Sequence, residues 1–306
     1  RGQLRHAHNT IGFSLHHMGN FAEAKKHYEI SASLYDRERD YLGAPASGID
    51  TGVGFLSYWG ACLWFLGYPD QALQKVQQAL VLPASLTHPF SLQFAQFFMC
   101  IVRQSRREAA AAQESAERNA ALGKEHGFAD ALVYTNIQYG WSIAKQRRSD
   151  EGIELIRQGL AALGATGTNL GRPYWLSHLA DIYLDKGRFA EGLDVVAEAL
   201  TLGEQNEDLQ LAAELQRLRG ELLHRRDESG ITEARKCFER AVEIARGQGA
   251  KSFELRATTS LARLLASQGR RDEARAMLSE IYNWFTEGFD TVDLKEAKAL
   301  LDELRR

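Results

Sequence analysis

The chain repeats one local pattern with a period near forty residues. In each copy a helical run ends at a small residue or a polar turn, and a small residue follows five positions later. The turns fall near residues 19, 67, 105, 147, 187, 229 and 269, which are separated by 48, 38, 42, 40, 42 and 40 residues. A period of this length, held along the whole chain, indicates a stack of similar supersecondary units.

A second small position lies seven residues before most of these turns. An isolated glycine inside a helix costs about 1 kcal/mol relative to alanine, so Gly60 requires a compensating contact. Two antiparallel helices whose backbones approach closely provide such a contact. The third and sixth units depart from the pattern with Phe98 and Leu222, although Gly220 indicates a two-residue insertion before the sixth turn. The other units carry Gly12, Gly60, Gly140, Ala180 and Ala262.

The second half of each unit reads as an amphipathic helix, and no alternating pattern is long enough to indicate a strand. We therefore expect an all-α fold: a right-handed superhelical solenoid of about seven helix hairpins, forming a single array over residues 1–306. A final capping helix is expected at about 291–304, because Leu294, Leu301 and Leu304 recur on one side of it.

Composition limits the partners and the compartment. The formal net charge of −3 gives nucleic acid no general attraction, and no apolar run is long enough to span a membrane. The three cysteines are far apart and odd in number, as is typical of reduced thiols. We expect a cytoplasmic protein that binds neither nucleic acid nor membrane. Because the helical pattern is already present at Arg1, we expect the chain to be a fragment of a longer protein.

The spacing and the small residues resemble tetratricopeptide repeats, with units of about forty residues in place of the usual 34. Several stretches are more specifically similar to the C-terminal repeat arrays of bacterial signalling proteins in which a class III adenylate or guanylate cyclase domain precedes an ATPase. The resemblance implies that the cyclase and ATPase domains lie upstream of Arg1. The stretches are "GVGFLSYWGACLWFLGYPDQAL", "THPFSLQFA", "GRPYWL", "GAKSFELRATTSLARL" and "WFTEGFDTVDLKEAKALLDEL".

Motifs for nucleotide binding, metal binding and catalysis are missing from the sequence. Gly123-Lys124 is followed by Glu125 and lacks the earlier glycine of a phosphate-binding Walker loop, and the glycine-rich stretch 164–171 is interpreted as a loop. The histidines of the first unit are accompanied by no HExxH motif and no nearby cysteines. We expect no metal, no cofactor and no enzymatic activity in this fragment.

Side chains on the first helix of each unit are expected to line a concave groove. The early units place aromatic residues there and the later units place charged ones, whereas Phe97 is expected in the core. Each groove aromatic either contacts a ligand or packs on its neighbours, and the sequence leaves both open. The candidate binding residues are Asn9, Phe13, Trp64, Tyr134, Trp141, Tyr174, Arg217, Arg256 and Arg263, with Met99 in the third unit.

Two functions fit these features. The leading interpretation is a non-catalytic protein-interaction scaffold that binds a protein or peptide, or the ATPase and cyclase domains of its own chain, on the concave face. The alternative is a small-ligand sensor domain of an ATPase-linked signalling or transcription regulator. A mixed-charge groove favours the first, and a closed aromatic pocket favours the second.

Overall fold

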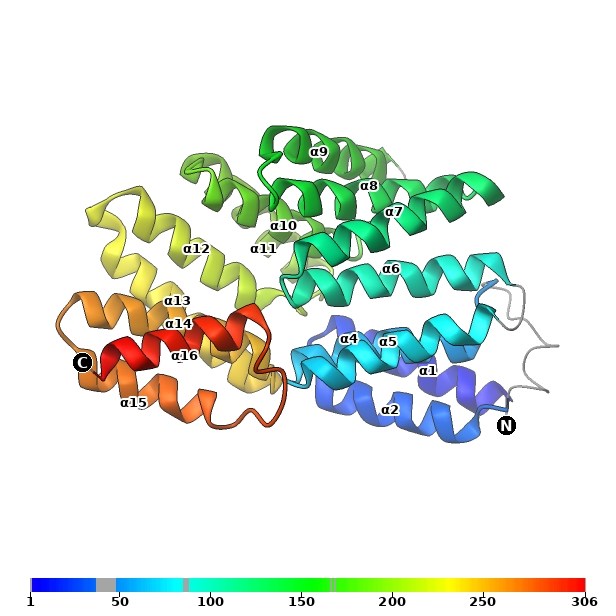
Figure 1. Cartoon of the computed structure of the whole chain (residues 1–306), viewed down its shortest axis with the longest axis horizontal. Helices are drawn as coiled ribbons and strands as arrows, with labels where there is room; N and C mark the ends of the chain where they lie inside the picture. Colours follow the sequence, from blue (N-terminus) through cyan, green and yellow to red (C-terminus); the bar gives the residue numbers. More distant parts are fainter. Residues whose placement is uncertain (1, 37–47, 85–87, 166, 168, 306) are drawn as a thin grey trace. The chain divides into compact units, whose positions relative to one another are not determined.

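The structure is a computed structural model and describes residues 2–36, 48–84, 88–165, 167 and 169–305. Within these ranges every regular element is helical, which confirms the all-α prediction (Figure 1). No helix of the described residues combines the length and the apolar composition that a membrane span requires. The elements are α1 (Gly2–His17), α2 (Phe21–Leu34), α4 (Thr51–Phe65), α5 (Pro69–Ala84), α6 (Pro89–Ser105), α7 (Ala109–His126), α8 (Ala129–Ala144), α9 (Ser149–Ala165), α10 (Arg172–Asp185), α11 (Phe189–Gln205), α12 (Ala212–Arg226), the 3-10 helix η1 (Glu228–Gly230), α13 (Ile231–Gln248), α14 (Lys251–Ser267), α15 (Arg271–Tyr282) and α16 (Val292–Leu304).

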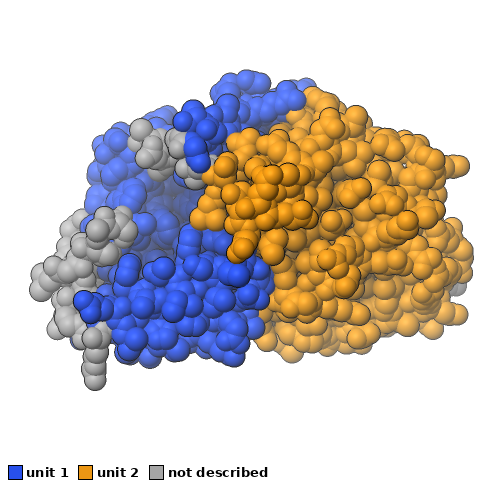
Figure 2. Space-filling model, turned by 180° about the vertical axis from the view of Figure 1, so that it is seen from behind, with its two compact units in different colours: residues 1–64, 69–167 blue, residues 65–68, 168–306 orange. Residues whose placement is uncertain are grey.

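The chain divides into two compact units, coloured separately in Figure 2. Unit 1 comprises residues 1–64 and 69–167, and unit 2 comprises residues 65–68 and 168–306. Apart from residues 65–68, the division falls within the glycine-rich stretch 164–171, whose first two residues belong to α9. Consecutive helices form hairpins, in which α1, α4, α6, α8, α10, α12 and α14 are the first helices and α2, α5, α7, α9, α11, α13 and α15 are the second helices.

Most hairpins reverse direction through a residue in the left-handed conformation. Gly19, Gly67, Gly187 and Gly269 have φ values of 80°, 93°, 70° and 79°, which glycine adopts without strain. Arg107 and Arg147 take the same role with φ values of 61° and 80°, at a cost of about 1–2 kcal/mol each. The turn between α6 and α7 is therefore centred on Arg107, two residues later than the sequence pattern predicts.

The small positions lie where the two helices of a hairpin meet. A Cβ atom on Gly60 would lie 3.0 Å from the carbonyl oxygen of Ala72 and 2.7 Å from Cγ1 of Val76. A Cβ atom on Gly140 would lie 2.7 Å from the carbonyl oxygen of Gly152. Close backbone approach thus accounts for a glycine in the middle of α4. Gly12 faces the ring of Tyr28 in the same way, and Ala180 and Ala262 are fully buried.

The two departures from the small-residue pattern have structural causes. Seven residues before Arg107 the chain has Cys100, whose Sγ donates a hydrogen bond to the carbonyl oxygen of Ala112 at 3.3 Å. The small position of the third hairpin is therefore Cys100 rather than Phe98. In the sixth hairpin it is Gly220, because a Cβ atom there would lie 3.1 Å from the carbonyl oxygen of Ala234, and η1 occupies the longer turn.

The C-terminal end of unit 2 is covered by α16. Helix α15 ends at Tyr282, and irregular chain leads from there to Thr291. The Thr291 hydroxyl donates to the carbonyl oxygen of Gly288 at 2.6 Å, just before α16 begins. One side of α16 joins the core of α14 and α15, while Lys298 and Asp302 form an ion pair on its exposed side. The buried residues of α16 are Leu294, Ala297, Leu300, Leu301 and Leu304.

Candidate functional site

The candidate residues predicted from the sequence all lie on first helices. In unit 1, Asn9 and Phe13 lie on α1, Trp64 on α4, and Tyr134 and Trp141 on α8; in unit 2, Tyr174 lies on α10, Arg217 on α12, and Arg256 and Arg263 on α14. Their chemistry differs between the units. Apart from Asn9, the candidate residues of unit 1 are aromatic, whereas those of unit 2 are mainly charged.

Aromatic rings from four first helices touch one another in unit 1. Phe13 of α1 packs edge-on against Tyr58 of α4 with ring centroids 5.2 Å apart, and Tyr58 packs against Phe98 of α6 at 4.6 Å. Phe97 contacts Phe98 at 5.4 Å and Tyr134 of α8 at 5.7 Å. We call Phe13, Tyr58, Phe97, Phe98 and Tyr134 the aromatic row. Edge-to-face ring pairs at such distances attract one another, so the row supports its own geometry.

Most of the aromatic row retains solvent-accessible surface. Phe98 is buried, but Phe13, Tyr58, Phe97 and Tyr134 are half-buried. Rigid rings that are fixed by their neighbours offer a large contact area at a low cost in entropy. The row is therefore suited to binding apolar groups of a partner.

Two predicted groove tryptophans have a different environment. Trp64 is only 4% exposed and Trp141 only 3%. A large aromatic side chain at this level of burial contributes chiefly to packing. Of the two interpretations left open for these tryptophans, their burial favours packing.

Buried amides set the spacing of the helices that carry the row. Nε2 of Gln138 on α8 donates to the backbone oxygen of Phe97 on α6 at 3.0 Å. Nε2 of Gln104 on α6 donates in return to the backbone oxygen of Gln138 at 3.4 Å. Both glutamines are buried, where hydrogen bonds are strengthened by the low dielectric. These contacts therefore hold Phe97 next to Tyr134.

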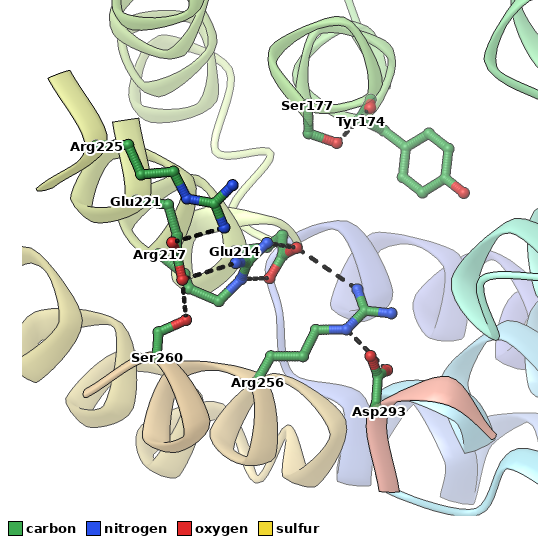
Figure 3. Close-up of polar contacts among 9 residues, drawn as sticks. All are labelled: Tyr174, Ser177, Glu214, Arg217, Glu221, Arg225, Arg256, Ser260 and Asp293. Carbon is green, nitrogen blue, oxygen red and sulfur yellow. Dashed lines mark hydrogen bonds and ion pairs between the residues drawn. The ribbon is translucent and has the colours of Figure 1, made fainter. Parts of the chain in front are cut away.

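Unit 2 carries a network of charged side chains on α12, α14 and α16 (Figure 3). Arg217 donates from Nε and Nη2 to the carboxylate of Glu214 at 2.8 and 2.7 Å. Arg256 lies between Glu214, at 3.5 Å, and Asp293, at 2.8 Å. Glu221 accepts a hydrogen bond from Ser260 at 2.6 Å. We call Glu214, Arg217, Glu221, Arg256 and Asp293 the charged ladder.

The ladder is held mostly out of water. Each of its side chains is 14% exposed or less. Burial by itself would lower the pKa of the Arg217 guanidinium, but Glu214, Glu221 and Asp181 outweigh burial and raise that pKa above its ordinary value. Arg217 therefore stays charged within the ladder.

The ladder connects alternate helices of unit 2. The carboxylate of Glu214 binds arginines from both α12 and α14, and Arg256 in turn reaches Asp293 on α16 (Figure 3). A charged ligand would have to replace these internal ion pairs. Arg263, which is half exposed and lies 3.4 Å from Glu296, is a more accessible charged group.

Tyr174 lies apart from the ladder on α10. Its ring is buried against Trp175 and His178, with centroid distances of 4.8 and 4.7 Å. Ser177 donates to its backbone oxygen at 2.7 Å (Figure 3). This environment is that of a packed aromatic side chain.

The histidines of the first hairpin contain one close pair. Nδ1 of His8 on α1 lies 2.9 Å from Nδ1 of His27 on α2, so one ring donates a hydrogen bond and the other accepts it. Across the described part of the chain, no group of three or more His, Cys, Asp or Glu side chains has an arrangement that would hold a metal ion.

Sequence reasoning missed two half-buried members of the aromatic row, Phe97 and Tyr58. Phe97 was expected in the core and Met99 in the groove, but Phe97 is half-buried and Met99 is buried. The cause is the turn at Arg107: counted from it, Phe97 stands ten residues before the turn, as the candidate residue Asn9 does before Gly19. Tyr58 was missed because it stands nine residues, and not ten, before the turn residue Gly67.

No protein-family model matches the chain. An uncharacterized protein of Rhizobium meliloti (strain 1021) is 25% identical over 271 residues, which make up 88% of this chain and 26% of that protein. The chain thus spans about a quarter of the length of this relative.

Solved structures show the same fold. A Rap protein complexed with Competence and Sporulation Factor matches with a TM-score of 0.61 and 12% identity, over 100% of this chain and 81% of that one. NprR in complex with its cognate peptide NprX matches with a TM-score of 0.60 and 11% identity, over 98% of this chain and 82% of that one. A tetratricopeptide repeat protein from Parabacteroides merdae matches with a TM-score of 0.50 and 11% identity, over 99% of this chain and 100% of that one. Because such identities are informative about fold alone, the comparisons establish that this chain is built from tetratricopeptide-like helix hairpins.

Proposed function

We propose that this chain is a non-catalytic interaction scaffold that binds a protein or peptide segment along the first helices of unit 1. The observation that carries the proposal is the aromatic row. Rings from α1, α4, α6 and α8 form one connected series, although their residues are spread from position 13 to position 134. An elongated partner that follows these helices contacts several hairpins at once.

The aromatic row is favoured over the charged ladder as the recognition surface. A partner covers the half-buried rings of Phe97 and Tyr134 without breaking any contact between them. At the ladder, by contrast, it has to compete with the two arginines already bound to Glu214. Removing buried charged groups from their partners is costly, so the ladder is better suited to holding helices together.

The structural neighbours support this function by analogy. NprR was solved in complex with its cognate peptide NprX, and the Rap protein was solved in complex with Competence and Sporulation Factor. The resemblance to the repeat arrays of cyclase and ATPase signalling proteins supplies a source for the partner: a segment of an ATPase or cyclase domain in a longer form of the same protein. This assignment rests on the resemblance of stretches such as "GRPYWL" at 171–176.

A selection from a library of random short peptides tests the proposal without knowledge of the natural partner. We expect the selected peptides to be rich in apolar and aromatic residues. Phe97→Ala should weaken their binding by about 1–3 kcal/mol, because it removes a central ring of the row. The matched control is Phe90→Ala on the same helix, since Phe90 packs on Phe128 and is 37% exposed.

The two variants distinguish the possible results. Loss of binding in Phe97→Ala but not in Phe90→Ala supports recognition by the row. If the library yields no binder, or if binders tolerate Phe97→Ala and depend on Arg263 instead, the aromatic row is not the binding surface. Thermal unfolding of each variant, measured in parallel, separates lost binding from lost structure.

A further inference from the structure

One side of α1 is apolar and exposed. Leu4 and Ile11 on α1 and Met18, which directly follows its last residue, are spaced at intervals of seven residues and are 54%, 44% and 42% exposed. Between them lie two small exposed residues, Ala7 and Ser14. We call these five residues the open face of α1. Such a row of exposed apolar side chains on a helix is typical of a surface that packs against another helix.

Later hairpins bury the positions that correspond to Ala7 and Ser14. Ala7 stands twelve residues before the left-handed turn residue Gly19, and Ser14 stands five before it. In the later hairpins that turn at a left-handed residue, the residues at the first of these positions are Phe55, Ala95, Thr135, Trp175 and Ala257, and those at the second are Cys62, Val102, Ser142, Ile182 and Leu264. All ten are buried. The exposure of Ala7 and Ser14 is therefore particular to the first hairpin.

The second helix of the preceding hairpin contacts these positions inside unit 1. Thr135 on α8 accepts a hydrogen bond from Asn119 on α7 at 3.1 Å. Cys62 on α4 donates through Sγ to the backbone oxygen of Phe21 at the start of α2, at 3.3 Å.

Apolar contacts between a first helix and the second helix of the preceding hairpin occur in both units. Ala95 on α6 belongs to one core cluster with Ala79 on α5. In unit 2, Ala257 on α14 clusters with Ala241 and Val242 on α13. A helix that precedes the first helix thus covers the same side of it in several hairpins.

We propose that the open face of α1 binds the second helix of a further hairpin that lies N-terminal to α1 in a longer polypeptide. Ala7 and Ser14 allow the close approach that Ala95 and Ala257 allow in their hairpins, and the larger side chains around them supply apolar area. The opposite terminus differs, because α16 buries its leucines and exposes Lys298 and Asp302. A stack of hairpins needs an outer helix with such a polar side at both ends, and α1 does not provide one.

The length of the relative agrees with this occupant. The matched region makes up 26% of the Rhizobium meliloti protein, so most of that protein lies outside it. The proposal does not depend on the binding function of the aromatic row.

A copy of one of the chain's own hairpins serves as the probe. Residues 209–250, which contain α12 and α13, are joined directly to Arg1 of the full 306-residue chain. In the native sequence Ala257 follows residue 250 by seven positions, and Ala7 follows it by seven in the fusion. The copied α13 then meets Ala7 in the register in which α13 meets Ala257. Hydrogen exchange of the α1 amides and the melting temperature are measured with and without the added hairpin.

We expect the added hairpin to slow exchange of the α1 amides by roughly tenfold or more, because docking suppresses local opening. Ala7→Glu should abolish the slowing in the fusion, since a large charged side chain prevents close approach. In the original chain Ala7→Glu should leave exchange and melting unchanged, because Ala7 is exposed there. Equal exchange rates with and without the hairpin overturn the proposal. A dimer of the original chain that Ala7→Glu dissociates also overturns it, because a second copy then occupies the face.

Discussion

Nε of Arg256 on α14 lies 2.8 Å from Oδ2 of Asp293 on α16, and this ion pair joins the last hairpin of unit 2 to the helix that covers it. Both side chains are largely buried, and Arg256 also reaches Glu214 on α12. Three helices that are separated in the sequence by intervening helices are thus connected through one guanidinium group.

Removal of the Arg256 charge should destabilise the chain. We expect Arg256→Met to lower the free energy of unfolding by about 2–4 kcal/mol, because Asp293 then remains buried without its partner. Urea denaturation followed by circular dichroism measures the change. The matched control is Arg240→Met, whose partner Glu243 lies on the same exposed helix surface, and there the change should be below about 0.5 kcal/mol. Equal losses in the two variants would show that burial of the ladder does not matter.

Glycines in two helices should respond oppositely to alanine. Gly60→Ala should lower the free energy of unfolding by about 1–3 kcal/mol, since its Cβ atom meets Ala72 and Val76. Gly247→Ala on α13, where a Cβ atom meets nothing within 4 Å, should raise it by about 0.5–1 kcal/mol through helix propensity. Thermal and urea unfolding measure both. A stabilised Gly60→Ala variant would contradict close approach of α4 and α5.

Stability should fall at alkaline pH through the buried thiols. Burial raises the pKa of Cys62 and of Cys100 far above the ordinary thiol value. The stability that the two buried thiols contribute is therefore complete below the unfolded pKa of about 8.5. It declines as the pH rises above this value, because only the thiols of the unfolded chain ionise. Each thiol should reduce the free energy of unfolding by about 1.4 kcal/mol per pH unit in this range. Urea unfolding between about pH 7 and pH 9.5 measures the slope.

The matched control for the alkaline slope is the double variant Cys62→Ala and Cys100→Ala. It should be less stable at neutral pH but should lose less stability as the pH rises. A slope that the double variant leaves unchanged would assign the effect to other groups.

Two aromatic residues of α8 should separate packing from recognition. Trp141→Ala should lower the free energy of unfolding by about 3–5 kcal/mol, because the side chain is nearly fully buried. Tyr134→Ala, at a half-buried ring of the row, should cost less stability but should weaken binding of the selected peptides. Calorimetric titration and thermal unfolding give the two readouts. The reverse pattern would place the recognition surface near Trp141.

Deletion of α16 should expose the core of α14 and α15. Removing residues 290–306 uncovers Leu265, Leu278 and Ile281, so we expect a lower melting temperature and stronger binding of an apolar fluorescent dye. Removal of residues 305–306 alone is the control, since Leu304 remains in place. An unchanged melting curve in the longer deletion would refute the covering role of α16.

The period of small residues was sufficient to predict the helix hairpins, because glycine and alanine mark close contacts between helices. The register of the third hairpin was wrong where that marker fails. Arg107 adopts the left-handed conformation that glycine takes elsewhere, and in the alanine run 109–112 the small residue five positions later fits a turn at 105 as well as one at 107. Phe97 was therefore expected on the wrong side of α6.

The charged ladder was only partly accessible to sequence reasoning. Counting from the turns places Arg217 and Arg256 on first helices, since that step needs only the helical period. To predict that Arg256 pairs with Asp293, one has to know that α14 lies next to α16, although α15 stands between them in the sequence. This neighbourhood depends on packing between hairpins, which a single sequence does not encode as a local pattern.

The charged ladder also affects how unit 2 unfolds. A stack of hairpins with only nearest-neighbour contacts frays from its ends, one hairpin after another. The ion pairs Glu214–Arg256 and Arg256–Asp293 each join neighbouring members of the stack and share one guanidinium group, so separating α16 also disturbs the contact of Arg256 with α12. We therefore expect α16 to unfold together with the interior of unit 2, as one cooperative block.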